Sequence, residues 1–576
     1  MNRRLMVGTL MALALIFLLP GAARAQATGG SIAGQVLDAN GAAVPNATVT
    51  LRNEANGQTL TAQTSESGAY NFPNVLVGNY TVTVEANGFQ KATQNVPVSL
   101  SNESSVNTVL QVAGLGAETV EVSGGGEALV QTENSQLSRN FEERQVQDLP
   151  IFNDPRSLAL LSPNVVAQGA GVTGDGGSVG GTRPRSNTFN VDGVDNNDPS
   201  VTGRQLEIIQ DAISEVAILT NNFNAEFGTG AGGQFNTVTK SGTNEYHGSG
   251  FLYFQSQKLN AATTGEEAAI QRGDLLEKPQ LRQPRYGGTF GGPILKNKLF
   301  FFGAYQRTDL KQQGSGVSYS APTSEGLTRI AAIPGVSPFV AGLLRDNLTL
   351  AASASETREV LGVAGIPFGQ VSIVTPNDLL QTQFQLNIDY LRGEKDQFRF
   401  RYSQDGQTQQ QPGNGNVKFN NTVTQPVKLF SAGWIRLFTP NVVNELRLSY
   451  KRFKQDFVLD DPAFETFPNL TVPDLNLGLG PNGNLPQGGF DNSYQLYDAV
   501  SLSRGAHAFK FGGEARFLIF TSFFLPRGRG DYVYANLDEL LLDRAPTVVD
   551  LRGVGSSAFT GNQQKYYAFA QDDWKV

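Results

Sequence analysis

The side chains that most often carry catalysis or bind metals are scarce in this chain of 576 residues. It contains no cysteine and only two histidines, His247 and His507, which lie far apart and belong to no HExxH or HxxE pattern. The lack of cysteine excludes thiolate catalysis, disulfides, Cys-ligated zinc and iron–sulfur clusters. Two isolated histidines leave almost no residues from which a His-based triad or a zinc hydrolase site could be built. We expect no enzymatic activity, no catalytic residue, no cofactor and no metal site.

Phosphate and nucleic-acid binding are also poorly supported. The glycine-rich segment 174–181 lacks the G-K-[ST] lysine and hydroxyl of a P-loop. The net charge of −8 and the pI near 5.1 oppose a nucleic-acid partner, because neutralising phosphates needs a clustered basic surface. Charged residues make up 17% of the chain, against about 25% in a typical soluble domain, and glycine and phenylalanine are abundant. This balance is typical of membrane barrels and adhesins.

The first 25 residues are predicted to be an export signal. Arg3 and Arg4 give a positive start, Leu5–Leu19 is an apolar run, and Ala23–Ala25 forms an A-x-A cleavage site. The run is shorter than the ~20 residues of a membrane-spanning helix. No later stretch approaches 18 consecutive apolar residues, so only a β-barrel could still cross a bilayer.

Residues 26–112 are predicted to form a small β-sandwich. Short alternating runs are separated by Asn-Gly and Ser-Gly turns, as in Thr81–Val84 before Asn87-Gly88. The order G-x-V-x-D-x-x-G-x-x-V-P-x-A-x-V at Gly34–Val49 and S-G-A-Y-x-F at Ser67–Phe72 resembles the carboxypeptidase regulatory-like domain, a transthyretin-type sandwich. That domain accompanies many partners, so it does not imply peptidase activity.

Residues 113–126 are predicted to be a linker that contains a strand-forming segment between glycine clusters. An extended segment flanked by flexible glycines can add itself to the edge of a partner's sheet. In composition and place it resembles the TonB box of energised outer-membrane receptors; alternatively it is a last sandwich strand or a plain linker. The candidate residues are Glu118, Thr119, Val120, Glu121, Val122 and Ser123.

Residues 127–245 are predicted to form a small α/β plug. Short helices are indicated at Phe141–Pro150 and Pro155–Leu161, and a helix followed by a strand at Leu206–Leu219. The runs D-G-V-D-N-N-D at Asp192–Asp198, A-E-F-G at Ala225–Gly228 and T-K-S-G-T-N-E-Y-H-G at Thr239–Gly248 closely resemble the plug of TonB-dependent receptors, especially the Oar-like group.

Four plug residues are candidates for function. Asp192 and Gly193 form the Asp-Gly turn of the D-G-V-D-N-N-D motif. The resemblance implies that Arg183 and Arg185 face the polar inside of the barrel. Ordinary solvated charge is the alternative for both arginines.

Residues 246–576 are predicted to be the N-terminal part of an outer-membrane β-barrel. Phe384, Leu386, Ile388 and Tyr390 alternate with polar residues, and arginines occupy the other face of the returning strand, as expected where one face meets lipid and the other a wet or plugged lumen. Short turns alternate with long connections along ten readable strands. Plugged transporters have about 22 strands, so we expect a C-terminally incomplete sequence whose open, curved sheet has edges near Tyr246 and Trp574.

The predicted fold class is thus mainly β: a transthyretin-like sandwich, an α/β plug and a partial, open antiparallel transmembrane barrel. The resemblance implies a TonB-dependent importer in the outer membrane, its N-terminal domain in the periplasm, with an inner-membrane TonB-type protein as partner. Amide-rich connections such as Gln407–Asn416 suit neutral oligosaccharides or peptides, although simple solvation would also account for them. The alternative function is a surface structural or adhesion protein of the same architecture without active uptake.

Overall fold

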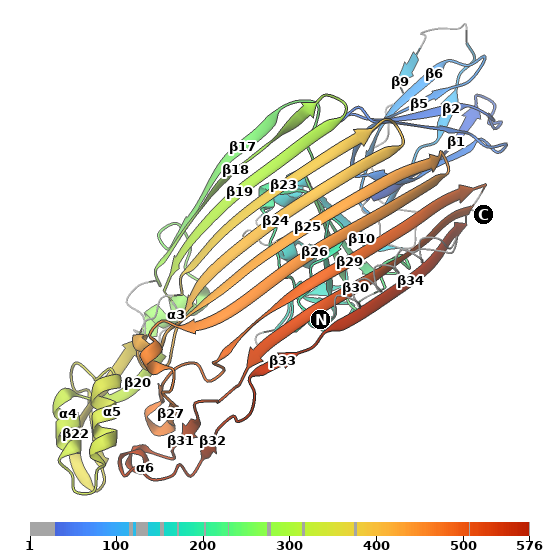
Figure 1. Ribbon diagram of the computed structural model, residues 1–576. Coiled ribbons are helices and arrows are strands. Elements are labelled where there is room, and N and C mark those ends of the chain that lie inside the picture. The colour runs from blue at the N-terminus through green and yellow to red at the C-terminus, as the bar shows by residue number, and fades with distance from the viewer. Residues whose placement is uncertain are drawn as a thin grey trace.

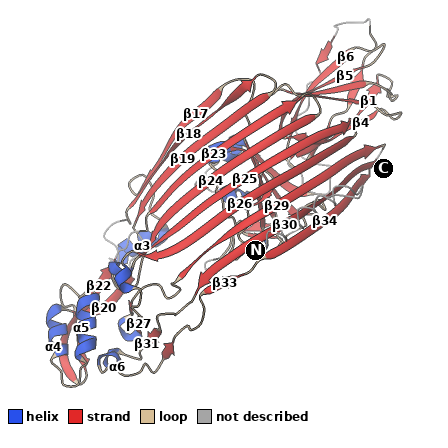
Figure 2. Ribbon diagram, viewed as in Figure 1, coloured by secondary structure: helices blue, strands red, loops and turns tan. Residues whose placement is uncertain are grey.

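The computed structural model describes residues 29–113, 119–121, 136–149, 155–169, 172–200, 203–228, 230–272, 278–313, 317–373, 377–505 and 507–574. The predicted export signal lies outside these ranges. Strands dominate the described residues, and the expected mainly β class is confirmed (Figures 1 and 2). No helix within the described ranges is long and apolar enough to cross a membrane.

The N-terminal sandwich consists of two small sheets. Successive side chains of a strand point to opposite faces, and this alternation places Val49, Val82 and Val84 between the two sheets, where they are almost fully buried. One sheet has the order β4-β1-β7 with β8 also on β1, and the other has the order β3-β2-β5-β6-β9. The strands are β1 (Gly29–Asp38), β2 (Thr48–Asn53), β3 (Thr59–Gln63), β4 (Ala69–Leu76), β5 (Gly78–Glu85), β6 (Lys91–Val98), β7 (Glu103–Ser105), β8 (Thr108–Leu110) and β9 (Thr119–Glu121).

The plug is a five-stranded sheet of order β10-β15-β16-β13-β14 with short helices around it. Phe141, Phe189, Ile218 and Phe235 pack in its core. Where a helix was expected before the strand in 206–219, only the 3-10 turn η3 (Gln210–Ala212) forms, because Ile213, Val216 and Ile218 belong to a strand paired on both sides. The other elements are β10 (Leu137–Glu142), α2 (Glu143–Asp148), η1 (Pro155–Leu161), β11 (Val165–Val166), β12 (Ser178–Val179), η2 (Pro184–Ser186), β13 (Thr188–Val191), β14 (Val194–Asp195), β15 (Ile213–Asn221) and β16 (Gln234–Thr239).

A large antiparallel sheet curves around the plug without closing (Figure 1). Its long strands are β17 (His247–Ser256), β18 (Leu281–Leu295), β19 (Leu299–Gln312), β23 (Leu379–Arg392), β24 (Asp396–Gln411), β25 (Asn421–Thr439), β26 (Val442–Leu459), β29 (Gln487–Arg504), β30 (His507–Phe524) and β34 (Gln563–Trp574), and the short β33 (Ala558–Thr560) also pairs with β30. Among the described strands, β17 and β34 are the edges, as the open-sheet prediction required.

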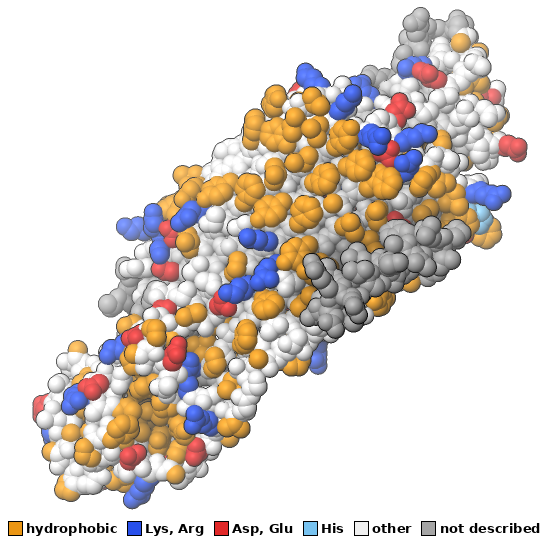
Figure 3. Space-filling model, in the orientation of Figure 1, with side chains coloured by type: hydrophobic (Ala, Val, Ile, Leu, Met, Phe, Trp, Pro, Cys, Tyr) orange, Lys and Arg blue, Asp and Glu red, His pale blue; other side chains and the backbone are white. Residues whose placement is uncertain are grey.

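The two faces of this sheet follow the predicted alternation. On β23 the amide row Gln381, Gln383, Gln385 and Asn387 is buried toward the plug, whereas Phe384 is 42% exposed on the other face. Hydrophobic side chains gather over the outer face of the strands (Figure 3). An apolar outer face and a polar inner face are what a transmembrane barrel requires.

The long connections between the strands fold together into a separate lobe, here called the head (Figure 1). Its core includes Tyr319, Phe368, Phe419, Leu475 and Leu541, which come from four connections and are all nearly inaccessible. Its elements are β20 (Val317–Pro322), α4 (Ser324–Ala331), α5 (Pro338–Asn347), β21 (Glu356–Val360), β22 (Val363–Ile373), η4 (Val417–Phe419), η5 (Pro462–Phe464), β27 (Asn469–Val472), η6 (Pro473–Leu475), β28 (Leu477–Leu479), β31 (Asp531–Val533), α6 (Leu537–Leu541) and β32 (Val549–Leu551). A further helix, α3 (Thr264–Arg272), lies in the β17–β18 connection.

The short turns and the long connections lie at opposite ends of the sheet, and the sandwich is at the short-turn end (Figure 1). There its 99–102 turn is fixed to the plug. Leu100 packs with Leu219 and Phe227, and its N–H donates to Glu215 Oε1 at 2.8 Å. The Asn140 amide donates to the Leu100 carbonyl at 2.9 Å. The sandwich is therefore seated on the plug and on the end of the sheet.

Candidate functional site

The D-G-V-D-N-N-D motif forms a tight turn between β13 and β14 inside the curved sheet. Asp192 and Gly193 both have positive φ, 47° and 72°, the pair that a type I′ hairpin turn needs. The Asp192 carboxylate accepts hydrogen bonds from Thr239, at 3.1 Å from its N–H and 2.7 Å from its hydroxyl. At Gly193 a Cβ would collide with the Arg447 guanidinium of β26, so a larger residue would have to displace that contact and would also be strained by the positive φ.

Three cations of the sheet hold this turn, and we call Arg447, Lys451 and Arg516 the turn clamp. Arg447 donates to the Gly193 carbonyl. Lys451 Nζ donates to the Asn197 carbonyl at 3.0 Å, and Arg516 Nη1 lies 2.9 Å from Asp195 Oδ1. Each cation is at most 7% exposed. Buried charges persist where partners satisfy them, so the clamp depends on the plug being seated.

The Asp195 carboxylate is ionised in this arrangement. Burial, the largest influence, would raise its pKa, but the charges of Arg516 and Lys451 together with a hydrogen bond from Asn197 outweigh burial and hold the pKa below its usual value. The contact with Arg516 is therefore a buried ion pair, and removing Arg516 would take away the cation that has the larger effect on the Asp195 pKa.

The two candidate arginines of η2 are less enclosed. Arg183 and Arg185 are both exposed. Arg185 borders a cavity of about 280 Å³ that Asp195, Lys451 and Arg516 also line, whereas Arg183 is not among its lining residues. The structure thus brings Arg185, Asp192 and Gly193 to one region, and the roles inferred for the two arginines stay predictions.

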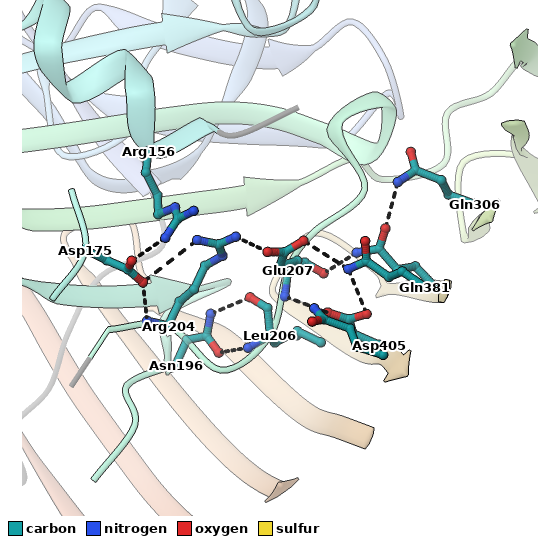
Figure 4. Close-up of polar contacts among 11 residues, drawn as sticks. Arg156, Asp175, Asn196, Arg204, Leu206, Glu207, Gln306, Gln381 and Asp405 are labelled. Carbon is teal, nitrogen blue, oxygen red and sulfur yellow. Dashed lines mark hydrogen bonds and ion pairs between the residues drawn. The ribbon is translucent and has the colours of Figure 1, made fainter. Parts of the chain in front are cut away.

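A second polar network joins the plug to β23 and β24 near the long connections (Figure 4). Arg204 lies between Asp175 and Glu207 and contacts both carboxylates. Gln381 Nε2 then donates to Glu207 Oε2 at 2.9 Å and to Asp405 Oδ1 at 3.0 Å. Plug and sheet are therefore linked by alternating charged and amide groups.

Beside this network lies a cavity of about 260 Å³, here called the apex cavity. The sheet contributes Gln407 and Gln425, which are direct cross-strand neighbours, together with Gln455 and Phe453. The plug contributes Arg156, Asp175, Asp198, Arg204, Gln205 and Glu207. Amides that both donate and accept, next to an aromatic ring, can bind neutral polar ligands such as sugars or peptide groups.

Sequence reasoning named two of the apex residues, Asp198 in the D-G-V-D-N-N-D run and Gln407, which it placed in a connection although Gln407 lies on β24. It did not single out the others. Arg204 and Glu207 stand in a stretch without a recognisable motif, and the sheet partners of Glu207, Gln381 and Asp405, are more than 170 positions away. The sequence did contain one sign of this region, the amide row on β23. The alternation of apolar and polar residues showed that these amides share the inner face of the strand, but not which plug residues they contact.

The candidate TonB box is described only at Thr119–Glu121, which forms β9 at the edge of the sandwich, parallel to β6. Glu118, Val122 and Ser123 lie outside the described residues. This pairing corresponds to the alternative of a last sandwich strand. The partner-binding role of the segment stays a prediction.

Across the described ranges, no group of three or more His, Asp or Glu side chains is arranged to hold a metal ion.

Comparisons with known proteins agree with this architecture. Residues 238–576, more than half of the chain, match the family model described as outer membrane beta barrel domain, and residues 31–111 match the carboxypeptidase regulatory-like domain. The TonB-dependent transporter Oar of Myxococcus xanthus is 30% identical over 298 residues, which cover 48% of this chain and 26% of that protein. The outer membrane transporter YddB of Escherichia coli has a similar fold, with a TM-score of 0.50 at 10% identity over 76% of this chain and 54% of that one. The chain thus spans about a quarter of the curated relative and about half of the solved transporter.

Proposed function

We propose an import function from the premise that the chain belongs to the outer membrane beta barrel domain family and carries a carboxypeptidase regulatory-like domain. In this proposal it is a TonB-dependent receptor. A substrate binds in the apex cavity, a TonB-type protein of the inner membrane pulls on Glu118–Ser123, and the plug rearranges within the barrel. The observation that supports it most strongly is the turn clamp, because buried but non-covalent polar contacts can hold a plug and still release it.

The domain assignment belongs to the same proposal. Residues 1–25 are the signal peptide, 26–112 the sandwich, 113–126 the linker with the candidate box, 127–245 the plug and 246–576 the N-terminal part of the barrel. The outer face of the strands contacts outer-membrane lipid, and the sandwich lies in the periplasm.

A neutral oligosaccharide or peptide is the proposed substrate class, because the sheet side of the apex cavity is lined by glutamines and one phenylalanine. Replacing Gln407→Ala and Gln425→Ala together should weaken binding of such ligands about 10-fold or more, since each hydrogen bond contributes roughly 0.5–1.5 kcal/mol. Binding of mixed malto-oligosaccharides and of a peptide digest to the purified chain measures this effect, with a ferric catecholate as comparator.

Gln404→Ala is the matched control, because Gln404 lies on the opposite face of β24 and bonds to Tyr402. Its affinity should match that of the parent chain. Tight catecholate binding without oligosaccharide or peptide binding would contradict the proposed substrate class, as would induction by iron starvation but not by growth on such polymers.

The proposed orientation can be tested with two tags. Gly41 in the sandwich and Gly362 in the head both have positive φ and open space around the position of a Cβ, so insertions there should be tolerated. On intact cells, antibody or protease should reach a tag at 362 but should reach a tag at 41 only after the outer membrane is permeabilised. Access to the tag at 41 from outside would show that the orientation, and the importer proposal with it, is wrong.

A surface structural or adhesion protein is the second candidate function. The folded head favours it, since a lobe with its own core suits contact with other surfaces better than separate loops would. The two functions differ in whether the candidate box is needed.

A further inference from the structure

Strand β9 is an unusual addition to the sheet that it joins. The pairs β2–β3, β2–β5 and β5–β6 are all antiparallel, whereas β9 runs parallel to β6 and covers only Lys91–Thr93. The match to the carboxypeptidase regulatory-like domain ends at residue 111, before β9 begins. The sandwich family therefore accounts for the sheet up to β6, and the candidate box supplies the strand beyond it.

The open edge of β6 is a surface suited to an extended segment. An edge strand presents unpaired N–H and C=O groups, and a second strand satisfies them whatever its side chains are. One row of directly opposite residues runs across all five strands of the sheet, and β9 continues it. The row consists of Thr61, Thr50, Thr83, Thr93 and Glu121. Residues 119–121 thus continue the sheet in register.

The sandwich also keeps this edge at a fixed place. Strand β6 ends at Val98, directly before the turn in which Leu100 packs against the plug and is bonded to Glu215 and Asn140. On the same side, Asn71 donates to the Ser503 hydroxyl and Asn74 to the Glu445 carboxylate of the sheet. A segment paired with β6 is therefore tied to a body that is braced on both plug and barrel.

We infer that the β6 edge is a resting dock for Thr119–Glu121 and competes with the TonB-type partner for this segment. The inference rests on the proposed function, because it takes residues 118–123 as the partner's target. A partner that pairs with the segment and pulls it away has to displace it from β6. The short three-residue pairing makes this exchange feasible, because only a few backbone hydrogen bonds are given up and the partner's sheet replaces them.

The absence of cysteine from the chain makes the dock testable by a reversible crosslink. Thr93→Cys and Glu121→Cys are register partners, so oxidation, or a short bismaleimide where disulfide geometry is unfavourable, should join them in the full-length protein. Thr50→Cys with Thr61→Cys is the matched control, because this pair lies in the same row at the opposite edge of the sheet. Failure of the Thr93/Glu121 pair to crosslink by either chemistry, while the control pair does, would overturn the dock.

The second measurement uses the purified periplasmic domain of the TonB-type protein as probe. Capture of the full-length chain by this domain should fall at least 10-fold when the Thr93/Glu121 pair is oxidised, return on reduction, and be unaffected in the control pair. Excess partner domain should likewise slow oxidation of the Thr93/Glu121 pair about 10-fold.

Two negative outcomes are distinct. Capture that is equal before and after oxidation shows that the partner does not compete with β6, which refutes the dock and leaves the proposed function standing. No capture of any form, reduced or parent, contradicts TonB dependence itself and the dock with it.

Discussion

Replacing Glu118–Ser123 with six glycine and serine residues is expected to reduce energised uptake to the background of cells without the protein, while substrate binding stays at the parent level. Uptake should fail because the partner loses the extended segment that it pairs with and pulls. Binding should survive because the apex cavity is lined by plug and sheet residues, and the described part of the segment, Thr119–Glu121, is not among them. Uptake and surface binding of one labelled ligand, with and without a protonophore, measure both quantities.

The control replaces the adjoining Gly124–Gly126 with three serines, which alters the linker and leaves the segment intact. This variant should transport normally. Unchanged uptake in the segment variant would rule out the importer and favour the adhesion alternative, which has no use for an energised segment.

Removing one member of the turn clamp should have the largest effect on the plug. Arg516→Ala leaves Asp195 and Glu514 buried beside each other without their shared cation, and Arg447→Ala leaves Glu445 and the Gly193 carbonyl without theirs. Breaking a buried pair in this way costs about 3–5 kcal/mol. We expect the free energy that holds the plug in the barrel to fall by a similar amount. This loss should be seen as faster hydrogen exchange at β13 and β14 and as increased entry of bulky antibiotics into cells.

Arg452→Ala is the control for the clamp. Arg452 is exposed on the other face of β26, over Phe490, and such surface changes usually shift stability by less than about 0.5 kcal/mol. Adding Asp195→Ala to Arg516→Ala should recover part of the loss, because one of the two carboxylates that shared Arg516 is then gone. Equal exchange rates in the clamp variants and in Arg452→Ala would show that the turn is held by other contacts.

The parts of this fold that could be predicted from the sequence are those set by local periodicity. The alternation of Phe384 with Gln383 and Gln385 fixes which face of β23 meets the plug, because successive side chains on a strand point to opposite sides. The Asp192-Gly193 turn was equally readable, since few residue pairs accept positive φ at both positions. Neither signal depends on distant parts of the chain.

The head and the apex cavity could not be predicted in this way. Phe419, Leu475 and Leu541 sit in connections that each carry too few apolar residues to make a core, and only their assembly excludes water. The readable signals were the caps of its helices, where Thr323 and Ser337 accept hydrogen bonds from the first turns of α4 and α5. Such caps predict helices but not what the helices pack against.

The shared core of the head sets an order of events during biogenesis. Tyr319 and Phe368 are made early, but α6, which contributes Leu540 and Leu541, follows them by more than 150 residues and emerges only after β30. Contacts between such distant segments form slowly, because the intervening chain must first be brought together. The head can therefore complete its core only after most of the described strands have been synthesised, and until then the apolar side chains of the early segments lack the partners that bury them.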